Sequence, residues 1–467
     1  MTSSSCPVTR RQFGKWLGAL PLALHLKADQ FASMPWNEPA TVARVFLAGE
    51  MSHWPKVGLD VRAEVSEIEG RLREVQSLNA RHARFVGGEI LRGEAEVKPW
   101  LAKYGNADGV LMIPLMQPTP PLRALVDGLC VPALFFSRPY ATHAWSSIAA
   151  YQKAGKKIDV VATSSYGDLD PYMRAFRTAS HLRKSRVIVG AAPPGARQSI
   201  TDAYGSWFGT SFRFFTGREF EEAFRAVNEG EAKREADEFV KGALRVVEPS
   251  AREIEDGLRF YLAVQNIMKR EKANAVTIDC FGSLAANTLP GYPCIAWSKL
   301  NDVGLYGVCE ADIHSTMSQM LVTSYARVPG FVSDPVFDVS RNEVIHAHCV
   351  AATRMAGIDE PPAPYIIRNH LETAEGAVVQ VLMPSGRTIT VGRFNGPKDF
   401  MVSTAEVTGA VDSDRGCRSQ IRTRVPDAGK WLRAYGGGLH RVIFYGDHVR
   451  DIERMGRLMG FTVRREV

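Results

Sequence analysis

The sequence predicts an α/β protein: two doubly wound parallel-sheet domains followed by a C-terminal antiparallel domain of β-barrel type. Short apolar runs alternate with amphipathic helical patterns over most of the chain, which is typical of parallel βα units. The alternation starts again near residue 153, and beyond residue 357 it gives way to strands of two-residue periodicity. A chain of 467 residues, 45% of them hydrophobic and 23% charged, provides for several domains with ample cores.

These changes of pattern divide the chain into four segments. We expect an export signal and linker at 1–36, an N-terminal α/β domain at 37–152, a second α/β domain at 153–356, and a C-terminal β domain at 357–467. In the N-terminal domain we expect strands at 44–48, 84–86, 109–113 and 131–136, and helices at 60–76, 98–104 and 122–129. In the second domain we expect strands at 158–163, 186–190, 275–279, 304–308 and 330–332, and helices at 172–182, within 220–270 and at 312–323.

The C-terminal domain is expected to be antiparallel. Residues 366–383 and 388–407 alternate as strands do, and Pro384 and Gly386 between them suit a tight turn. A strand at 442–445 and a helix at 449–459 complete this domain. The glycines at 436–438 give the backbone freedom just before His440.

The N-terminus carries a twin-arginine export signal. Arg10 and Arg11 lie in the segment TRRQFGK, and a short apolar run follows at 16–26. This pattern predicts a bacterial protein that the Tat machinery exports, already folded, to the periplasm or beyond. The apolar run is too short for a stable membrane span.

Charge and cysteine usage narrow the class of protein further. The formal net charge is +7, and the four basic residues of the leader leave +3 for the remainder. Basic residues do not gather with interleaved aromatic residues, so no nucleic-acid partner is expected. The seven cysteines form no CxxC pair and lie mostly in apolar segments, which favours reduced core residues.

Three residues stand out as ligands for a divalent cation. Glu310 lies between an expected strand and an expected helix, where α/β proteins often hold ligands. Asp334 follows 24 residues later, at what we expect to be the end of a neighbouring strand. His440 comes 106 residues beyond Asp334, and we expect another domain to deliver it to the same point. Two carboxylates and one imidazole, with open positions left, favour a catalytic metal site over a structural one.

Each candidate also has a structural interpretation. A Glu that opens a helix can simply favour the helix dipole, and an Asp before Pro can be a turn residue; the combination and its spacing favour the metal site. Asp312 is expected to cap the helix or to support a ligand. His346 and His348 alternate as on a strand, so both are expected on one face, where they either line the pocket or form a core pair. Cys309 can adjoin the pocket, with packing the favoured role.

These motifs resemble the L-fucose isomerase and L-arabinose isomerase family, in particular its fucose-isomerase branch. The resemblance rests on the segment CEAD at 309–312 before a Met-containing helix, the segment PGFVSD at 329–334, and His440 before an apolar strand. It covers the chain from about residue 275 to the C-terminus. The chain is shorter than a typical fucose isomerase, and Leu439 stands where those enzymes carry an Asn that touches the sugar.

The resemblance implies a metal-dependent aldose–ketose isomerase that acts on a free pentose or deoxyhexose through an enediol. It implies that Glu310, Asp334 and His440 bind a divalent ion, most simply Mn²⁺, and that Glu310 and Asp334 also form the acid/base pair. It further implies a homo-oligomer. Two alternatives remain open: an altered family member that only binds sugar, and a metal-dependent lyase or hydrolase acting on a sugar derivative.

Overall fold

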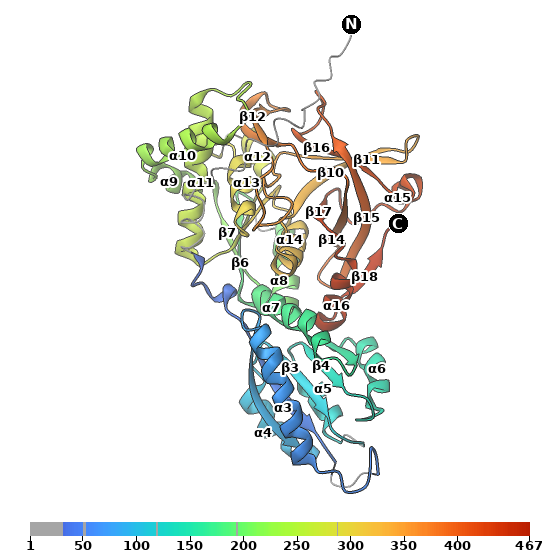
Figure 1. Cartoon of the computed structure of the whole chain (residues 1–467). Coiled ribbons are helices and arrows are strands. Elements are labelled where there is room, and N and C mark those ends of the chain that lie inside the picture. The colour runs from blue at the N-terminus through green and yellow to red at the C-terminus, as the bar shows by residue number, and fades with distance from the viewer. Residues whose placement is uncertain (1–30, 50–52, 118–119, 193–194, 287) are drawn as a thin grey trace.

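The computed structural model describes residues 31–467 except 50–52, 118–119, 193–194 and 287. The expected export signal lies outside these residues and stays a prediction. Figure 1 shows an N-terminal lobe below a larger body, in which a second α/β unit and a β-barrel lie side by side. Among the described residues, no helix is long and apolar enough to cross a lipid bilayer.

The N-terminal lobe is a five-stranded parallel sheet with helices packed on it. Its strand order is β2-β1-β3-β4-β5, and the chain leaves β1 first in one direction and then in the other, as expected for a doubly wound sheet. The strands are β1 Ala40–Leu47, β2 Ala83–Leu91, β3 Gly109–Pro114, β4 Ala133–Ser137 and β5 Ile158–Ala162, and the helices are α3 Val61–Leu78, α4 Val97–Tyr104, α5 Pro121–Gly128 and α6 Ile148–Lys153.

The second α/β unit contains a four-stranded parallel sheet of order β7-β6-β8-β9. Its strands are β6 Arg186–Gly190, β7 Ser211–Phe215, β8 Ala275–Ile278 and β9 Tyr306–Cys309. Its helices are α7 Asp170–Lys184, α8 Gly195–Phe208, α9 Gly217–Arg225, α10 Glu229–Gly242, α11 Ala251–Glu271, α12 Cys280–Ala285, α13 Cys294–Asp302 and α14 Ile313–Ala326. Helix α13 packs closely on β9, since a Cβ at Gly307 would lie 2.7 Å from the Cα of Trp297. This packing fixes the strand that leads to Glu310.

A closed six-stranded antiparallel barrel forms the third part. Its strands run in the order β14-β17-β10-β11-β16-β15, β15 pairs back with β14, and β18 adds to β15 in parallel. The elements are β10 Phe331–Asp338, β11 Glu343–His348, β14 Arg387–Phe394, β15 Asp399–Ala410, β16 Ser419–Arg424, α15 Ala428–Ala434, β17 Arg441–Tyr445, α16 Val449–Met459 and β18 Thr462–Arg465. The predicted fold class, two parallel-sheet α/β units followed by an antiparallel barrel, is therefore confirmed.

The structure differs from the expected boundaries in two places. Strand β5 completes the first sheet, although we expected residues 158–163 to open the second domain. Strands β10 and β11 belong to the barrel, which therefore begins well before residue 357. The reason is that β10 pairs not only with the next strand, β11, but also with β17 far along the chain, and sequence periodicity does not reveal such a pairing.

The turn expected at 383–387 is also placed differently. Strand β12 (Tyr365–His370) pairs with β13 (Glu375–Val381) in a separate hairpin, and β14 pairs with β15. The segment at 383–387 therefore connects two hairpins. The strand-like alternation of the sequence continues through the true turns, so their positions could not be predicted from it.

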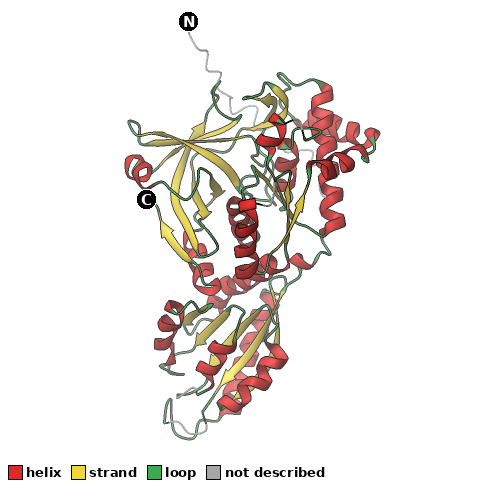
Figure 2. Ribbon diagram, turned by 180° about the vertical axis from the view of Figure 1, so that it is seen from behind, coloured by secondary structure: helices red, strands yellow, loops and turns green. Residues whose placement is uncertain are grey.

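Helix α14 lies between the second sheet and the barrel. Both views show it in this central position (Figures 1 and 2). It packs against β8 and β9 on the sheet side and against β14 and β17 on the barrel side. Eleven of its fourteen residues are buried, the polar residues Ser315, Ser318 and Gln319 among them. The N-terminus of α14 thus lies at the seam where residues of both parts can meet.

Candidate metal centre

Glu310 lies in a sharp turn between β9 and α14. Glu310 and Ala311 have φ angles of 65° and 49°, in the left-handed region that non-glycine residues seldom adopt. The amide of Ala311 donates to the carbonyl of Ile278 at 2.9 Å, and Asp312 caps α14 by accepting from the amide of Ser315 at 3.0 Å. Strained backbone of this kind costs about 1–3 kcal/mol per residue and clusters at functional sites. The turn directs Glu310 toward the barrel.

Asp334 and His440 reach the same point from two neighbouring barrel strands. Ser333 of β10 pairs with Arg441 of β17. Asp334, the residue after Ser333, and His440, the residue before Arg441, therefore lie close together. Nε2 of His440 lies 3.4 Å from Oδ1 of Asp334 and 3.4 Å from Oε2 of Glu310. The three predicted residues are therefore close together. Asp334 arrives from the barrel, and not from the sheet of Glu310 as we expected.

The orientation of His440 is fixed by Asp312. Nδ1 of His440 lies 2.8 Å from Oδ2 of Asp312, so the ring donates its Nδ1 proton to that carboxylate. Nη2 of Arg393, from β14, donates to both carboxylate oxygens of Asp312 at 3.0 and 3.1 Å. All three side chains are less than a tenth exposed. This arrangement leaves the lone pair of Nε2 directed at Glu310 and Asp334, as in sites where a carboxylate orients a metal-binding His.

His348 approaches Glu310 from the end of β11. Its Nε2 lies 3.6 Å from Oε1 of Glu310, and ligand atoms of Glu310, His348 and His440 all lie within 4.8 Å of one another. Its Nδ1 accepts a hydrogen bond from the amide of Cys349 at 2.9 Å. In the neutral ring the proton is therefore on Nε2 and faces Glu310. Of the two imidazoles, His440 is the one with a free lone pair here.

The arrangement could hold a divalent metal ion. Three polar atoms at this point have no hydrogen-bond partner among the described residues: Oδ1 of Asp334, Nε2 of His348 and Nε2 of His440. Buried polar atoms are normally paired, so this group indicates a missing ligand. Two carboxylates and one imidazole suit a cation such as Mn²⁺ or Mg²⁺ with open positions. The side chains of Glu310 and Asp334 are 39% and 31% exposed, so a small molecule can reach them.

No family model matches this chain, and no curated protein matches it.

The two carboxyl groups differ in acidity. Contact with His348 and then with His440 lowers the pKa of Glu310 to about 2. Burial raises the pKa of Asp334, and the Glu310 carboxylate adds to that effect. Burial alone would lower the pKa of His440, but Asp312 and Glu310 outweigh it and raise that pKa to about 9. Glu310 is thus held as a carboxylate, and Asp334 is the group nearer to its protonated form.

The raised pKa of His440 predicts pH-dependent metal binding. A metal ion binds the neutral ring, so it must displace the proton that His440 carries below pH 9 or so. We expect the affinity for Mn²⁺ to rise about tenfold per pH unit from about pH 6 and to level off near pH 9. In the metal-free protein the sign is opposite, because the stability from protonated His440 is complete below pH 6.5 or so and is lost as pH rises through about 9. Calorimetric titration in buffers of different ionisation enthalpy counts the released proton; an affinity that does not change over this range would contradict the assignment.

Replacing Asp312 by Asn tests how His440 is oriented. Asn caps a helix about as well as Asp, so α14 should persist. The amide carries no charge to hold the Nδ1 proton of His440 or to pair with Arg393. We expect the affinity for Mn²⁺ to fall about 10- to 100-fold. Asp427→Asn is the matched control, because Asp427 caps α15 in the same way through the amide of Lys430; an equal loss in both variants would refute the orienting role.

The remaining predicted residues, His346 and Cys309, lie in different surroundings. His346 is fully buried inside the barrel, where Nδ1 lies 3.2 Å from the hydroxyl of Ser333 and the ring packs near Trp431. His346 and His348 are alternate residues of β11 and both are buried, and His348 is the one that lies near Glu310. Cys309 is buried and faces other thiols. Sequence reasoning missed Arg393, although a lone Arg in an apolar strand pattern was a usable signal.

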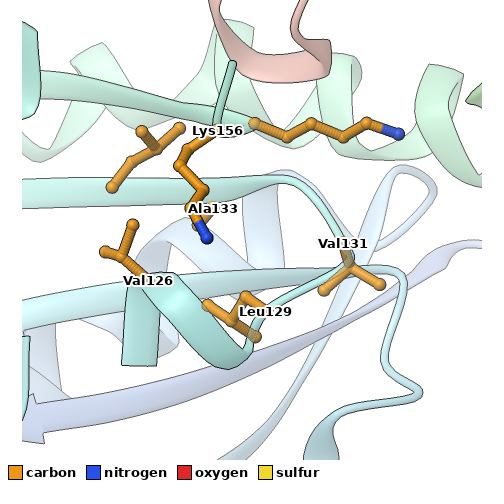
Figure 3. A pocket seen from close by; sticks show the side chains of 7 residues that line it. Val126, Leu129, Val131, Ala133 and Lys156 are labelled. Carbon is orange, nitrogen blue, oxygen red and sulfur yellow. The ribbon is translucent and has the colours of Figure 1, made fainter. Parts of the chain in front are cut away.

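Two hollows lie away from this centre. The one in Figure 3, lined by apolar side chains of α5 and β4 and by Lys156, encloses ≈ 10 Å³, which is room for no more than about one water. The other, at the end of β4, measures ≈ 320 Å³ and is lined by aromatic residues that include Trp54 and Tyr140. Both belong to the N-terminal lobe. Neither hollow therefore includes a residue of the candidate metal centre.

Proposed function

We propose that this chain is a metal-dependent aldose–ketose isomerase that acts on a free pentose or deoxyhexose. The observation that carries the proposal is the meeting of Glu310, Asp334 and Nε2 of His440 at a solvent-accessible seam, with unpartnered atoms directed at one point. This set agrees with the resemblance to the fucose-isomerase branch. Glu310, Asp334 and His440 would hold the cation, for which Mn²⁺ is the first candidate, and the cation would supply charge stabilisation for the sugar oxygens.

The protein groups supply the proton transfers. Isomerisation removes a proton from carbon 2 of the aldose and returns one to carbon 1, so that the formula stays unchanged. Glu310, which its neighbours keep ionised, is assigned as the group that accepts the proton, and Asp334, whose pKa burial raises, as the group that donates one to the sugar oxygen. His348 and His440 hold Glu310 between them. The Asp312 carboxylate keeps His440 in the required tautomer.

The leader residues and the resemblance add two further parts to the proposal. The twin-arginine segment favours folding in a bacterial cytoplasm and Tat export with the metal already bound. The resemblance favours a homo-oligomer. Chromatography with light scattering and fractionation of producing cells test these parts separately from the chemistry.

The test of activity is a panel of aldopentoses and 6-deoxyhexoses, incubated with the Mn²⁺-loaded protein in D₂O. We expect a ketose of unchanged carbon skeleton that carries solvent deuterium at carbon 1, and no product after chelation. Fragments or products of altered formula would instead support the lyase or hydrolase alternative. Sugar binding without conversion across the panel would support an altered family member and overturn the isomerase proposal.

A further inference from the structure

Most of the cysteines of the described chain gather in one place behind the candidate metal centre. Sγ of Cys349, just after β11, lies 3.4 Å from Sγ of Cys294, and Sγ of Cys309 lies within 4.8 Å of it. Cys417 and Cys280 are close enough to this group to affect the pKa values of its thiols. Cys130, the other cysteine of the described residues, lies exposed in the N-terminal lobe. The five clustered cysteines come from α12, α13, β9, β11 and the approach to β16, so the tertiary fold alone brings them together. This cluster could not be predicted from the sequence, since no two cysteines are close along the chain.

An imidazole nitrogen completes the surroundings of these thiols. Nδ1 of His348 lies 3.5 Å from Sγ of Cys349. The ligand atoms of Cys309, His348 and Cys349 all lie within 4.8 Å of one another. Nδ1 of His348 accepts from the backbone amide of Cys349 at 2.9 Å, so a cation bound to this nitrogen would replace that hydrogen bond. The two nitrogens of His348 therefore face two different groups of ligands.

The spacing suits a tetrahedral thiolate site. A Zn–S bond of about 2.3 Å places neighbouring sulfurs of a tetrahedron about 3.8 Å apart. Sγ of Cys294 lies 3.4 Å from Sγ of Cys349, a separation that small shifts would adapt to that edge. It is well beyond the roughly 2.05 Å of a disulfide, and all these cysteines are free thiols. Buried thiols can pack as small apolar groups, but apolar packing gives no reason for an imidazole nitrogen among them.

We propose that Cys309, Cys349 and Nδ1 of His348, completed by Cys294, form a second metal site that takes one soft or borderline cation of the Zn²⁺ or Cu⁺ class. Thiolate and imidazole ligands select such cations, whereas the carboxylates of the first centre select harder ones. Binding replaces thiol protons, which pass to the solvent, and requires no oxidant. His348 links the two sites, because its Nε2 faces Glu310. The proposal does not depend on the isomerase assignment.

The test is titration of the reduced full chain with Co²⁺, a spectroscopic substitute for Zn²⁺, under anaerobic conditions. We expect a near-ultraviolet sulfur-to-cobalt absorption band that saturates at about one equivalent. Cys349→Ser and Cys309→Ser should lose the band. Cys130→Ser is the matched control and should keep it, because that thiol lies far from the cluster. Glu310→Gln should also keep it, so failure of the first centre and failure of this site are distinguishable.

Two results would overturn the proposal. The wild-type chain could develop no sulfur-to-cobalt band, or the band could persist unchanged in both cysteine variants. Circular dichroism of each variant checks folding. If Cys349→Ser fails to fold, the result for Cys309→Ser tests the proposal. Serine has nearly the same shape as the Cys309 side chain, which is about 1% exposed.

Discussion

Replacing Glu310 by Gln is expected to reduce the isomerisation rate by about 10³-fold or more. The substitution preserves shape but removes the charge that, in the proposed mechanism, accepts the proton and contributes to metal binding. The low pKa of Glu310 shows that its surroundings are arranged for a carboxylate, because His348 and His440 both favour the charged form. The Gln amide carries no charge. It therefore cannot replace the carboxylate in its contacts with His348 and His440 or as a ligand for the metal. Steady-state rates of ketose formation at saturating Mn²⁺ measure the effect.

The control for this variant is Glu231→Gln, at an exposed position in α10. It removes the same charge far from the seam and should leave the rate unchanged. A Glu310→Gln variant that keeps the wild-type rate would exclude Glu310 as the proton acceptor. Retained Mn²⁺ with a lost rate would assign Glu310 to proton transfer and leave Asp334 and His440 as the main ligands.

Replacing Glu466 by Ala is expected to destabilise the protein by about 3–5 kcal/mol. Glu466 and Arg441 are almost wholly buried, and they pair through two bonds of 2.6 and 2.9 Å. Arg441 uses its other N–H groups on the carbonyls of Gly436, Gly438 and His440. Without Glu466 a buried guanidinium has no counter-charge, and the loop that carries His440 loses its anchor. Urea unfolding measures the stability, and Mn²⁺ titration should show weaker binding.

Two further variants separate the buried pair from ordinary surface charge. Glu453→Ala breaks the exposed pair with Arg465 and should cost less than about 1 kcal/mol. Arg441→Met combined with Glu466→Leu removes both buried charges and should be less destabilised than Glu466→Ala alone. A Glu466→Ala variant as stable as Glu453→Ala would show that the pair does not anchor this part of the barrel.

Local sequence patterns predicted the parts of the fold that depend on local structure. The turn at Glu310 and the cap at Asp312 follow from a strand pattern, an acidic pair and a helical pattern in adjacent segments. The parallel βα units were predicted for the same reason, because each strand is an apolar run that a helix follows. The residues expected to bind a metal could be chosen from the sequence because their motifs resemble those of the fucose-isomerase branch.

The pairing of strands that lie far apart along the chain could not be predicted from the sequence. The apolar run before Asp334 gave no sign that its partners are β17 and β11, so Asp334 was placed in the wrong sheet. The same limit hid the role of His348, whose position depends on where β11 ends, and the approach of Arg393 to Asp312. The thiol cluster around Cys349 depends on five separate elements and has no local pattern.

The central claim is that Glu310, Asp334 and His440 bind one hard divalent cation. The most direct measurement is elemental analysis after equilibration with Mn²⁺ and removal of excess ion, for wild type beside Glu310→Ala and His440→Ala. We expect about one Mn²⁺ per wild-type chain and none in either variant, and we expect no Mn²⁺ at the thiol site because thiolates do not favour this ion. A wild-type chain that retains no Mn²⁺, or a His440→Ala chain that retains it fully, would contradict the account.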